Sequence, residues 1–154
     1  MIILRQAITN DADFVFDVKK SGHSQDGSLW SWEDGIQRDL FRLAFLPEAF
    51  TVIQMDSHNV GVLTIEETPT ELWLHEIYLL PNYRNQGIGT AVIQEMCARA
   101  DRKNIPLKLQ VLKTNPAQHL YERLGFKVVD ETDPYFHMIR SREPVSPTTI
   151  SESN

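Results

Sequence analysis

The sequence predicts a single α/β domain of the α+β kind, and three observations lead to this prediction. Strand-like and helix-like hydrophobic patterns alternate along the 154 residues, and an apolar run at 72–80 is typical of a central strand covered on both faces. A short loop follows that run, and a helical pattern follows directly on Gly87 and Gly89. The length fits one hydrophobic core, so we expect a domain over residues 1–140 and a flexible, Pro- and Ser-containing tail over 141–154.

A strand and a helix are predicted at the N-terminus. Residues 2–7 carry a strand pattern. Thr9 or Asn10 can cap a helix that runs through Lys20, because short polar side chains accept hydrogen bonds from the first amides of a helix. The polar, glycine-containing residues 22–29 are predicted to form a loop.

A second helix and a hairpin follow. Residues 31–34 resemble a capping box, and the helix that they open ends before Pro47. Its apolar positions fall on one face: Ile36, Leu40 and Leu43. Strand patterns over 50–55 and 60–66 are separated by a polar turn at 56–59, so we expect these strands to pair antiparallel.

The central run begins the second half of the predicted domain. Glu76 is the only carboxylate inside it. Residues 81–87 are predicted to be a loop, and apolar positions at helical spacing predict a helix over 88–103. The remaining elements are a strand at 106–112, a helix that begins at Pro116 and ends at the left-handed cap Gly125, and strands at 127–131 and 135–140.

Composition narrows the function. The net charge of −6 argues against general binding to nucleic acid or anionic membranes, which depends on Lys and Arg, and no apolar run is long enough to cross a bilayer. The N-terminus lacks a secretion signal and the lone Cys97 cannot form an internal disulfide, so we expect a cytoplasmic protein in which Cys97 is a small buried apolar residue. No Cys or His spacing resembles a metal site.

The junction at residues 79–90 carries the strongest functional pattern. Backbone N–H groups at a helix N-terminus lack partners within the helix, and the helix dipole adds positive charge, so this junction can bind a pyrophosphate. A P-loop requires Lys-Ser/Thr after its last glycine, and a dinucleotide fingerprint requires a third small residue where Val92 stands; the sequence has neither. Taken alone, the Gly-x-Gly pattern also fits a tight turn without a ligand.

Two motifs together resemble the GNAT acetyltransferase superfamily. The segment RNQGIG at 84–89 is similar to the family's Arg/Gln-x-x-Gly-x-Gly/Ala motif. Further along the chain, NPAQHLYERLGF at 115–126 resembles its second signature, which combines an Asn, a small residue, a Tyr and a final Gly-Phe. The similarity extends over about 2–140, and it is sharp enough for residue-by-residue matching only over 72–126.

The resemblance implies a fold and an activity. The fold is a mixed, mostly antiparallel sheet of six to seven strands flanked by about four helices. Two central strands, 72–80 and 106–112, would splay apart to admit the pantetheine arm of acetyl-CoA. The implied activity is transfer of acetyl from acetyl-CoA, the co-substrate, to a primary amine of a small molecule or peptide by direct attack in a ternary complex.

The resemblance also assigns site residues. Glu76 falls where many members have a base, sometimes acting through water, and Tyr121 falls at the acid that protonates the departing thiolate. The implied cofactor-binding positions are Ile77, Leu79, Arg84, Asn85, Gln86, Gly87, Ile88, Gly89, Thr90, Asn115 and Tyr121.

Amine chemistry supports both catalytic roles. An alkyl amine with a pKa of about 10.4 is protonated at neutral pH, so a base must accept its proton, and enclosure in an apolar strand would suit Glu76 to this task. A thiolate with a pKa of about 8.5 needs less help, so loss of Tyr121 should slow the reaction without abolishing it. Each residue has a structural alternative: Glu76 can pair with a basic side chain across the sheet, and Tyr121 can be a core aromatic.

The acceptor side is less specific. Candidate acceptor contacts are Trp30, Trp32, His75 and His137. The tryptophans can equally pack under the second helix, and the histidines can be strand residues whose polar tips reach water. Two other function classes stay open, a non-catalytic acyl-CoA-binding or regulatory module and an interaction module on the same fold, as does a homodimer. The presence of both Glu76 and Tyr121 favours the enzyme.

Overall fold

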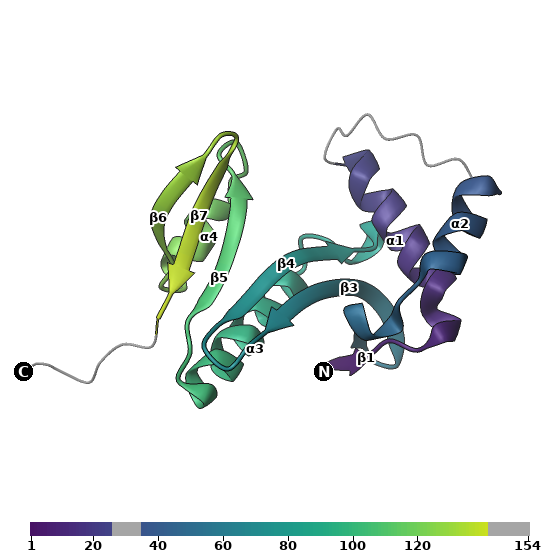
Figure 1. Cartoon of the computed structure of the whole chain (residues 1–154), viewed down its shortest axis with the longest axis horizontal. Coiled ribbons are helices and arrows are strands. Elements are labelled where there is room, and N and C mark those ends of the chain that lie inside the picture. Colours follow the sequence, from purple (N-terminus) through teal and green to yellow (C-terminus); the bar gives the residue numbers. More distant parts are fainter. Residues whose placement is uncertain (26–34, 142–154) are drawn as a thin grey trace, which may run out of the picture. The chain divides into compact units, whose positions relative to one another are not determined.

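The computed structural model describes residues 1–25 and 35–141, without the side chains of residues 23–25, and its fold comprises two compact units (Figure 1). Unit 1 contains Met1–Ile65 and Leu74–Val92. Unit 2 contains Glu66–Trp73 and the chain from Ile93 onwards. The single domain over 1–140 stays a prediction.

Seven strands form one mostly antiparallel sheet in the order β1-β2-β3-β4-β5-β7-β6. Only the pairing of β4 with β5 is parallel among the described pairs, and it joins Leu72 to Leu107 and Trp73 to Lys108. This confirms the predicted class of sheet, whereas the splaying of the two central strands stays a prediction. The strands are β1 (Ile2–Gln6), β2 (Thr51–Met55), β3 (His58–Glu67), β4 (Leu72–Leu79), β5 (Leu107–Leu112), β6 (Lys127–Thr132) and β7 (Tyr135–Arg140).

Four α-helices and three short 3-10 turns complete the described chain. The helices are α1 (Ala12–Gln25), α2 (Ile36–Ala44), α3 (Ile88–Lys103) and α4 (Ala117–Arg123). The 3-10 turns are η1 (Thr9–Asp11), η2 (Pro47–Ala49) and η3 (Pro81–Tyr83). No helix among the described residues has both the length and the apolar character needed to span a membrane.

The β2–β3 hairpin has the predicted position and a tight turn. Asp56 and Ser57 have φ angles of 50° and 71°, the left-handed conformations that a two-residue hairpin turn requires. The hairpin contributes Val62 to an apolar cluster in unit 1 that also contains Val15 and Val18 of α1. Aromatic side chains from α2 and β4 pack against this cluster and hold α1 on the sheet.

The start of α1 differs from the prediction. Neither Thr9 nor Asn10 caps the helix; η1 precedes it, and the carboxylate of Asp11 accepts a hydrogen bond of 2.8 Å from the amide of Ile8. Asp11 is buried and receives two further hydrogen bonds from the Arg5 guanidinium, at 2.8 and 2.9 Å. The Arg5 hydrogen bonds hold the pKa of Asp11 below its usual range.

The end of α1 also differs, because the predicted loop at 22–29 begins too early. The helix continues through Gly22 to Gln25. A Cβ at Gly22 would lie 2.3 Å from Cδ1 of Tyr78 on β4, so this glycine allows a helix to approach an aromatic ring closely. The glycine therefore reflects packing and not chain reversal.

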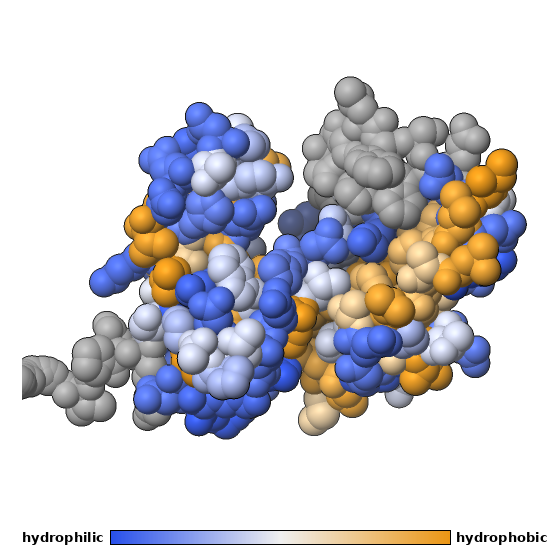
Figure 2. All heavy atoms as spheres, in the orientation of Figure 1, coloured by the Kyte–Doolittle hydropathy of each residue, from blue (hydrophilic) through white to orange (hydrophobic). Residues whose placement is uncertain are grey.

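Helix α2 presents two opposite faces. Arg38 and Arg42 reach carboxylates of α1, with Arg38 Nη2 2.6 Å from Asp17 Oδ1 and Arg42 Nε 2.9 Å from Asp13 Oδ1. The predicted apolar face exists, but it is solvent-exposed, with exposed fractions of 74% for Ile36, 56% for Leu40 and 85% for Leu43. Figure 2 shows apolar atoms gathered on the surface over α2. The predicted capping box at 31–34 lies outside the described residues.

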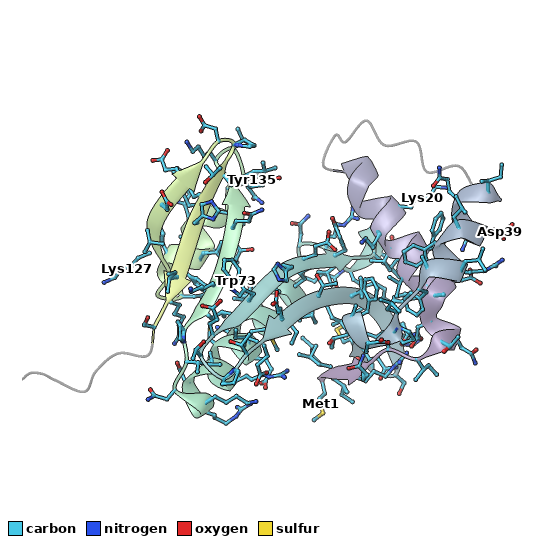
Figure 3. The ribbon with its side chains drawn as sticks, in the orientation of Figure 1. Met1, Lys20, Asp39, Trp73, Lys127 and Tyr135 are labelled. Carbon is cyan, nitrogen blue, oxygen red and sulfur yellow. The ribbon has the colours of Figure 1, made fainter. Side chains whose placement is uncertain are left out.

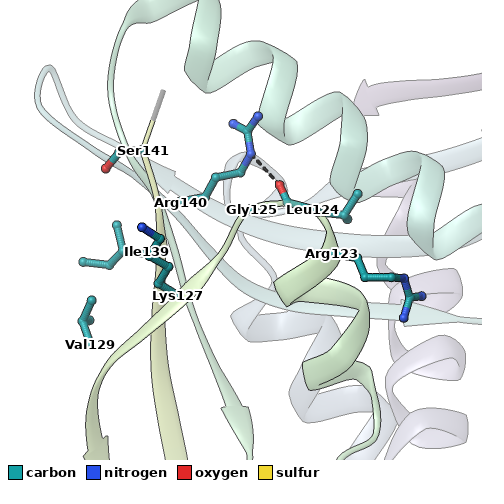
Figure 4. A pocket seen from close by; sticks show the side chains of 8 residues that line it. All are labelled: Arg123, Leu124, Gly125, Lys127, Val129, Ile139, Arg140 and Ser141. Atoms are coloured by element: carbon teal, nitrogen blue, oxygen red, sulfur yellow. Dashed lines mark hydrogen bonds between the residues drawn. The ribbon is translucent and has the colours of Figure 1, made fainter. Parts of the chain in front are cut away.

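In unit 2, α4 leads into β6 through the predicted left-handed cap. Gly125 has a φ of 102°, and the Phe126 amide donates to the Tyr121 carbonyl at 3.0 Å. Arg140 at the end of β7 donates to the Leu124 carbonyl at 2.8 Å and pairs with Asp101 of α3. Next to this bond lies a hollow of about 400 Å³, drawn in Figure 4, and none of the predicted site residues lines it.

Candidate active site

The turn between β4 and α3 has the geometry of a strand-to-helix junction. After η3, Asn85 and Gly87 take left-handed conformations with φ angles of 61° and 83°. These two residues redirect the chain into α3, whose first bond runs from the Ala91 amide to the Gly87 carbonyl at 3.0 Å. The predicted loop over 81–87 and the predicted helix over 88–103 are both confirmed.

Backbone amides from Asn85 to Thr90 donate no hydrogen bond to any described residue. A helix leaves its first N–H groups without partners, and here the preceding turn adds more of them. Their positive ends combine with the N-terminal end of the α3 dipole, which together favour a bound anion. The turn can therefore hold a pyrophosphate, as the sequence predicts for Asn85, Gln86, Gly87, Ile88, Gly89 and Thr90.

The two glycines of this turn are not explained by crowding within the described protein. A Cβ at either Gly87 or Gly89 would meet nothing within 4 Å. The left-handed φ of Gly87 explains that residue, but Gly89 is the second residue of α3 and has no left-handed φ that would require glycine. The open space beside Gly89 would allow a ligand to approach the backbone amides of the turn.

The Arg84 side chain braces the turn from within unit 1. Its Nε donates to the Leu79 carbonyl at 3.0 Å, and its Nη2 donates to Ser21 Oγ of α1 at 3.2 Å. Gln86 Nε2 donates to the Asn82 carbonyl at 2.7 Å. These side-chain bonds stabilise the turn and leave its backbone amides without protein partners among the described residues. Contacts of Ile77 and Leu79 with pantetheine stay predictions.

Glu76 on β4 does not have the enclosed setting that the sequence predicts. Its side chain is 37% exposed, and Oε1 lies 3.4 Å from Nζ of Lys19 on α1. The apolar run is continuous along β4, yet the alternation of side chains turns Glu76 towards α1 and the surface. The basic partner comes from a helix and not from across the sheet. A role as base stays a prediction.

The second motif lies in unit 2. Asn115 Oδ1 accepts a hydrogen bond of 2.9 Å from the Ala117 amide, so this side chain caps the first turn of α4, and its Nδ2 has no partner among the described residues. Tyr121 is buried, its ring centroid lies 5.6 Å from that of Phe126, and no described residue hydrogen bonds its hydroxyl. Burial raises the pKa of Tyr121, so the hydroxyl keeps its proton at neutral pH.

The candidate acceptor residues that the structure describes lie on different strands and in different units. His75 and Glu76 are neighbours on β4 and therefore point to opposite faces of the sheet. His137 of β7 lies in unit 2, with Nε2 3.0 Å from Thr132 Oγ1. Trp30 and Trp32 lie outside the described residues.

Cys97 is buried, as the sequence predicts, with an exposed fraction of 6%. Burial raises the pKa of its thiol, which keeps it in the poorly nucleophilic protonated form. This environment does not suit a covalent acetyl-enzyme at Cys97. Among the residues that the structure describes, no group of His, Cys, Asp and Glu could hold a metal ion.

Sequence reasoning missed the contribution of α1. Lys19, Ser21 and Gly22 contact Glu76, Arg84 and Tyr78, respectively. Helical spacing was the signal that could have revealed this contribution, because Lys19 and Gly22 are three residues apart and share a helix face. The sequence pattern instead predicts a loop that starts at Gly22.

Comparison with known proteins decides the family. A family model described as an acetyltransferase (GNAT) domain matches residues 47–128, which include the turn between β4 and α3 and both motifs. The chain belongs to the GNAT acetyltransferase family. This GNAT protein is an acetyl-CoA-dependent N-acetyltransferase that transfers acetyl to an amine.

Relatives and solved structures agree with this assignment. A ribosomal protein bS18-alanine N-acetyltransferase of Haemophilus influenzae is 24% identical over 139 residues, which is 88% of each chain. Thialysine N-epsilon-acetyltransferase of Mus musculus is 37% identical over 68 residues, which is 43% of this chain and 40% of the relative. The crystal structure of PaiA N-acetyltransferase from Thermoplasma acidophilum, in complex with coenzyme A, has a TM-score of 0.70 at 21% identity and covers 92% of this chain and 99% of that one.

Proposed function

We propose that the acetyl acceptor is the α-amino group at the N-terminus of a polypeptide, and that it attacks acetyl-CoA directly in a ternary complex. The observation that carries this proposal is the partly exposed, ion-paired setting of Glu76, whose side chain is 37% exposed. An α-amine has a pKa of about 7.7–8.0, against about 10.4 for a lysine side chain. A large fraction of an α-amine is thus already neutral near pH 7.5, and an open carboxylate that passes the proton to water suffices.

The extent of similarity supports the same acceptor. The relative named for an alanine N-acetyltransferase aligns along 88% of this chain, whereas the relative named for an N-epsilon transfer aligns along 43%. The net charge of −6 also attracts a cationic peptide.

Each proposed site residue has a stated task. The amides of Asn85–Thr90 hold the diphosphate, with Gly87 and Gly89 leaving room for it; Arg84 braces the turn. Asn115 Nδ2 is available to the pantetheine arm, and the protonated Tyr121 hydroxyl donates a hydrogen bond or a proton to the departing thiolate. No acyl-enzyme is needed, because positioning of both substrates can itself contribute about 7–11 kcal/mol.

Two matched peptides test the acceptor. The first is lysine-free, begins with alanine and has a free α-amine; the second has the same length, an acetylated N-terminus and one internal lysine. We expect thiol release and a gain of one acetyl group, measured by mass spectrometry, with the first peptide only. Transfer to the second peptide alone would overturn the α-amine proposal and leave the acetyltransferase itself intact.

Calorimetry with coenzyme A completes the test. We expect binding, together with thermal stabilisation that increases with coenzyme A concentration. Binding without transfer to either peptide or to a panel of polyamines and amino acids would favour the non-catalytic binding module.

Location and assembly are part of the proposal. The lone, buried thiol of Cys97 is consistent with a cytoplasmic protein. Retention of activity in a cytosolic cell fraction would support this location. Sedimentation velocity distinguishes a monomer from the homodimer that the sequence leaves open.

A further inference from the structure

One turn of α1 contacts β4 at two points. Lys19 Nζ lies 3.4 Å from Glu76 Oε1, and Gly22 packs against the ring of Tyr78. Lys19 and Gly22 share a face of α1, and Glu76 and Tyr78 share a face of β4. One face of α1 therefore contacts one face of β4 at both points.

The contact at Gly22 fixes the position of this helical turn. Its Cα approaches Tyr78 so closely that even a Cβ would lie 2.3 Å from the ring, so the helix cannot slide or rotate there without separating from β4. Ser21 on the same turn accepts the hydrogen bond from Arg84. The backbone of Lys19 is thus held against both β4 and the anion-binding turn.

The Lys19 side chain is held as well. Its exposed fraction is 18%, half that of Glu76, and its ammonium lies 5.6 Å from the centroid of the Phe50 ring. This cation–π contact and the packing of the stem leave the ammonium beside Oε1 of Glu76. No described residue pairs with Oε2 of Glu76.

We propose that Lys19 is a positioning residue that holds Oε1 of Glu76, so that Oε2 points at the acceptor amine. This inference rests on the proposed function, in which Glu76 receives the acceptor's proton. A lone carboxylate on a half-exposed side chain samples several rotamers, and a fixed ammonium at one oxygen selects among them. Lys19 does not touch the reacting atoms and acts only through Glu76.

A purely structural role would give a different pattern. An ion pair with one partner 37% exposed contributes little to the free energy of folding, so loss of this pair alone should leave the protein folded. A positioning role instead predicts lower kcat with unchanged KM for acetyl-CoA, because the anion-binding turn does not include Lys19. It also predicts that Lys19 matters only while Glu76 is present.

The experiment compares Lys19→Met, Lys19→Arg, Glu76→Gln and the Lys19→Met/Glu76→Gln double variant, with the lysine-free alanine peptide as acceptor. Lys19→Met keeps an apolar stem of similar length and loses the charge, and Lys19→Arg restores it. The control is Lys20→Met, which changes the adjacent lysine of α1 (Figure 3). Circular dichroism melting confirms that each variant folds.

We expect Lys19→Met to lower kcat about tenfold, less than the roughly 100-fold or more that complete loss of a general base costs, because Glu76 itself is still present. KM for acetyl-CoA should stay within about twofold of the wild type, and Lys19→Arg should recover most of kcat. The double variant should be no slower than Glu76→Gln alone, since positioning a missing carboxylate has no effect.

Three results would overturn the inference. These are an unchanged kcat in Lys19→Met, a loss in the double variant equal to the product of the two single losses, and an equal loss in Lys20→Met. If the wild type binds coenzyme A but does not acetylate the peptide, the proposed acceptor fails and the role of Lys19 fails with it. If the wild type acetylates the peptide and Lys19→Met has an unchanged kcat, the proposed function stands and only the positioning role is refuted.

Discussion

The end of α1 and the start of α3 contribute to the candidate site in opposite ways. In α1, Ser21 accepts a hydrogen bond from Arg84, and the Tyr78 ring occupies the space beside Gly22. In the first turn of α3, the amides have no described partner, and nothing lies within 4 Å of a Cβ at Gly89. The protein therefore occupies the space beside Gly22, whereas the space beside Gly89 is open to a ligand.

The largest expected effect is on coenzyme A binding in Gly89→Val. A branched side chain over the amides of the turn blocks the approach of the diphosphate, and we expect at least about a 100-fold loss of affinity, equivalent to about 2.7 kcal/mol. Calorimetric titration with coenzyme A measures this loss.

Gly89→Ala is the matched control for that variant. The family motif accepts alanine at this position, so affinity should stay within about threefold, and the better helix propensity of alanine should raise stability by up to about 1 kcal/mol. Wild-type affinity in Gly89→Val would show that the diphosphate does not lie over this turn.

The start of α1 gives the second prediction. Asp11 is buried against Arg5 at 2.8 Å, and we expect Asp11→Asn to lower the free energy of unfolding by about 2 kcal/mol at neutral pH, because it breaks charge-assisted hydrogen bonds. Urea denaturation measures this loss. Asp39, which is labelled in Figure 3, forms an exposed pair with Arg42 and provides the control, since Asp39→Asn should cost less than about 0.5 kcal/mol.

The pH dependence of this pair has a definite sign. The pKa of Asp11 is lower in the folded state, so its stabilisation is present above the unfolded-state pKa of about 3.9 and is lost as the pH falls through the folded-state value. The stability difference between the wild type and Asp11→Asn should therefore shrink below about pH 4. A difference that stays constant into acid would contradict the assignment.

Strand positions were predictable from the sequence because alternation and turn residues are local signals. The apolar run identified β4, and the polar residues at 56–59 identified the hairpin turn, to within a residue or two. The Gly-x-Gly junction likewise identified the strand-to-helix turn with its unpaired amides, because such amides follow from helix geometry alone, whereas cofactor binding there stays a prediction. These features need no knowledge of what packs against them.

Contacts between distant segments were not predictable. Gly22 looked like a loop residue because the Tyr78 ring that explains it is far along the chain, and Gly61 on β3 similarly lies against the carbonyl of Tyr78. Glu76 looked enclosed because the run around it is apolar, yet α1 leaves its carboxylate open beside Lys19. Asp11 lies in a 3-10 turn, and its carboxylate accepts a hydrogen bond from the Ile8 amide. The capping patterns of the sequence do not predict this turn.

Helix α4 supplies the third prediction, since its Tyr121 hydroxyl, like the amides of α3, has no described partner. Tyr121→Phe should lower kcat about tenfold and leave KM for acetyl-CoA within about twofold, because the hydroxyl assists a thiolate that is already a good leaving group. Steady-state kinetics with the alanine peptide measures both constants. Tyr135→Phe on β7 is the control, and an equal loss there would remove the specific role of Tyr121.

The smallest expected effect comes from Gly22→Ala, and it tests the structural half of the comparison. Overpacking against the Tyr78 ring costs about 1–3 kcal/mol, and the helix propensity of alanine offsets up to about 1 kcal/mol of it, so we expect a net loss of about 1 kcal/mol. Urea denaturation measures the loss, and Gln94→Ala on the exposed side of α3 should show none. Because Gly22 contacts protein and not ligand, coenzyme A affinity should stay within about twofold of the wild type. Loss of affinity without loss of stability would reverse the roles assigned to the two helices.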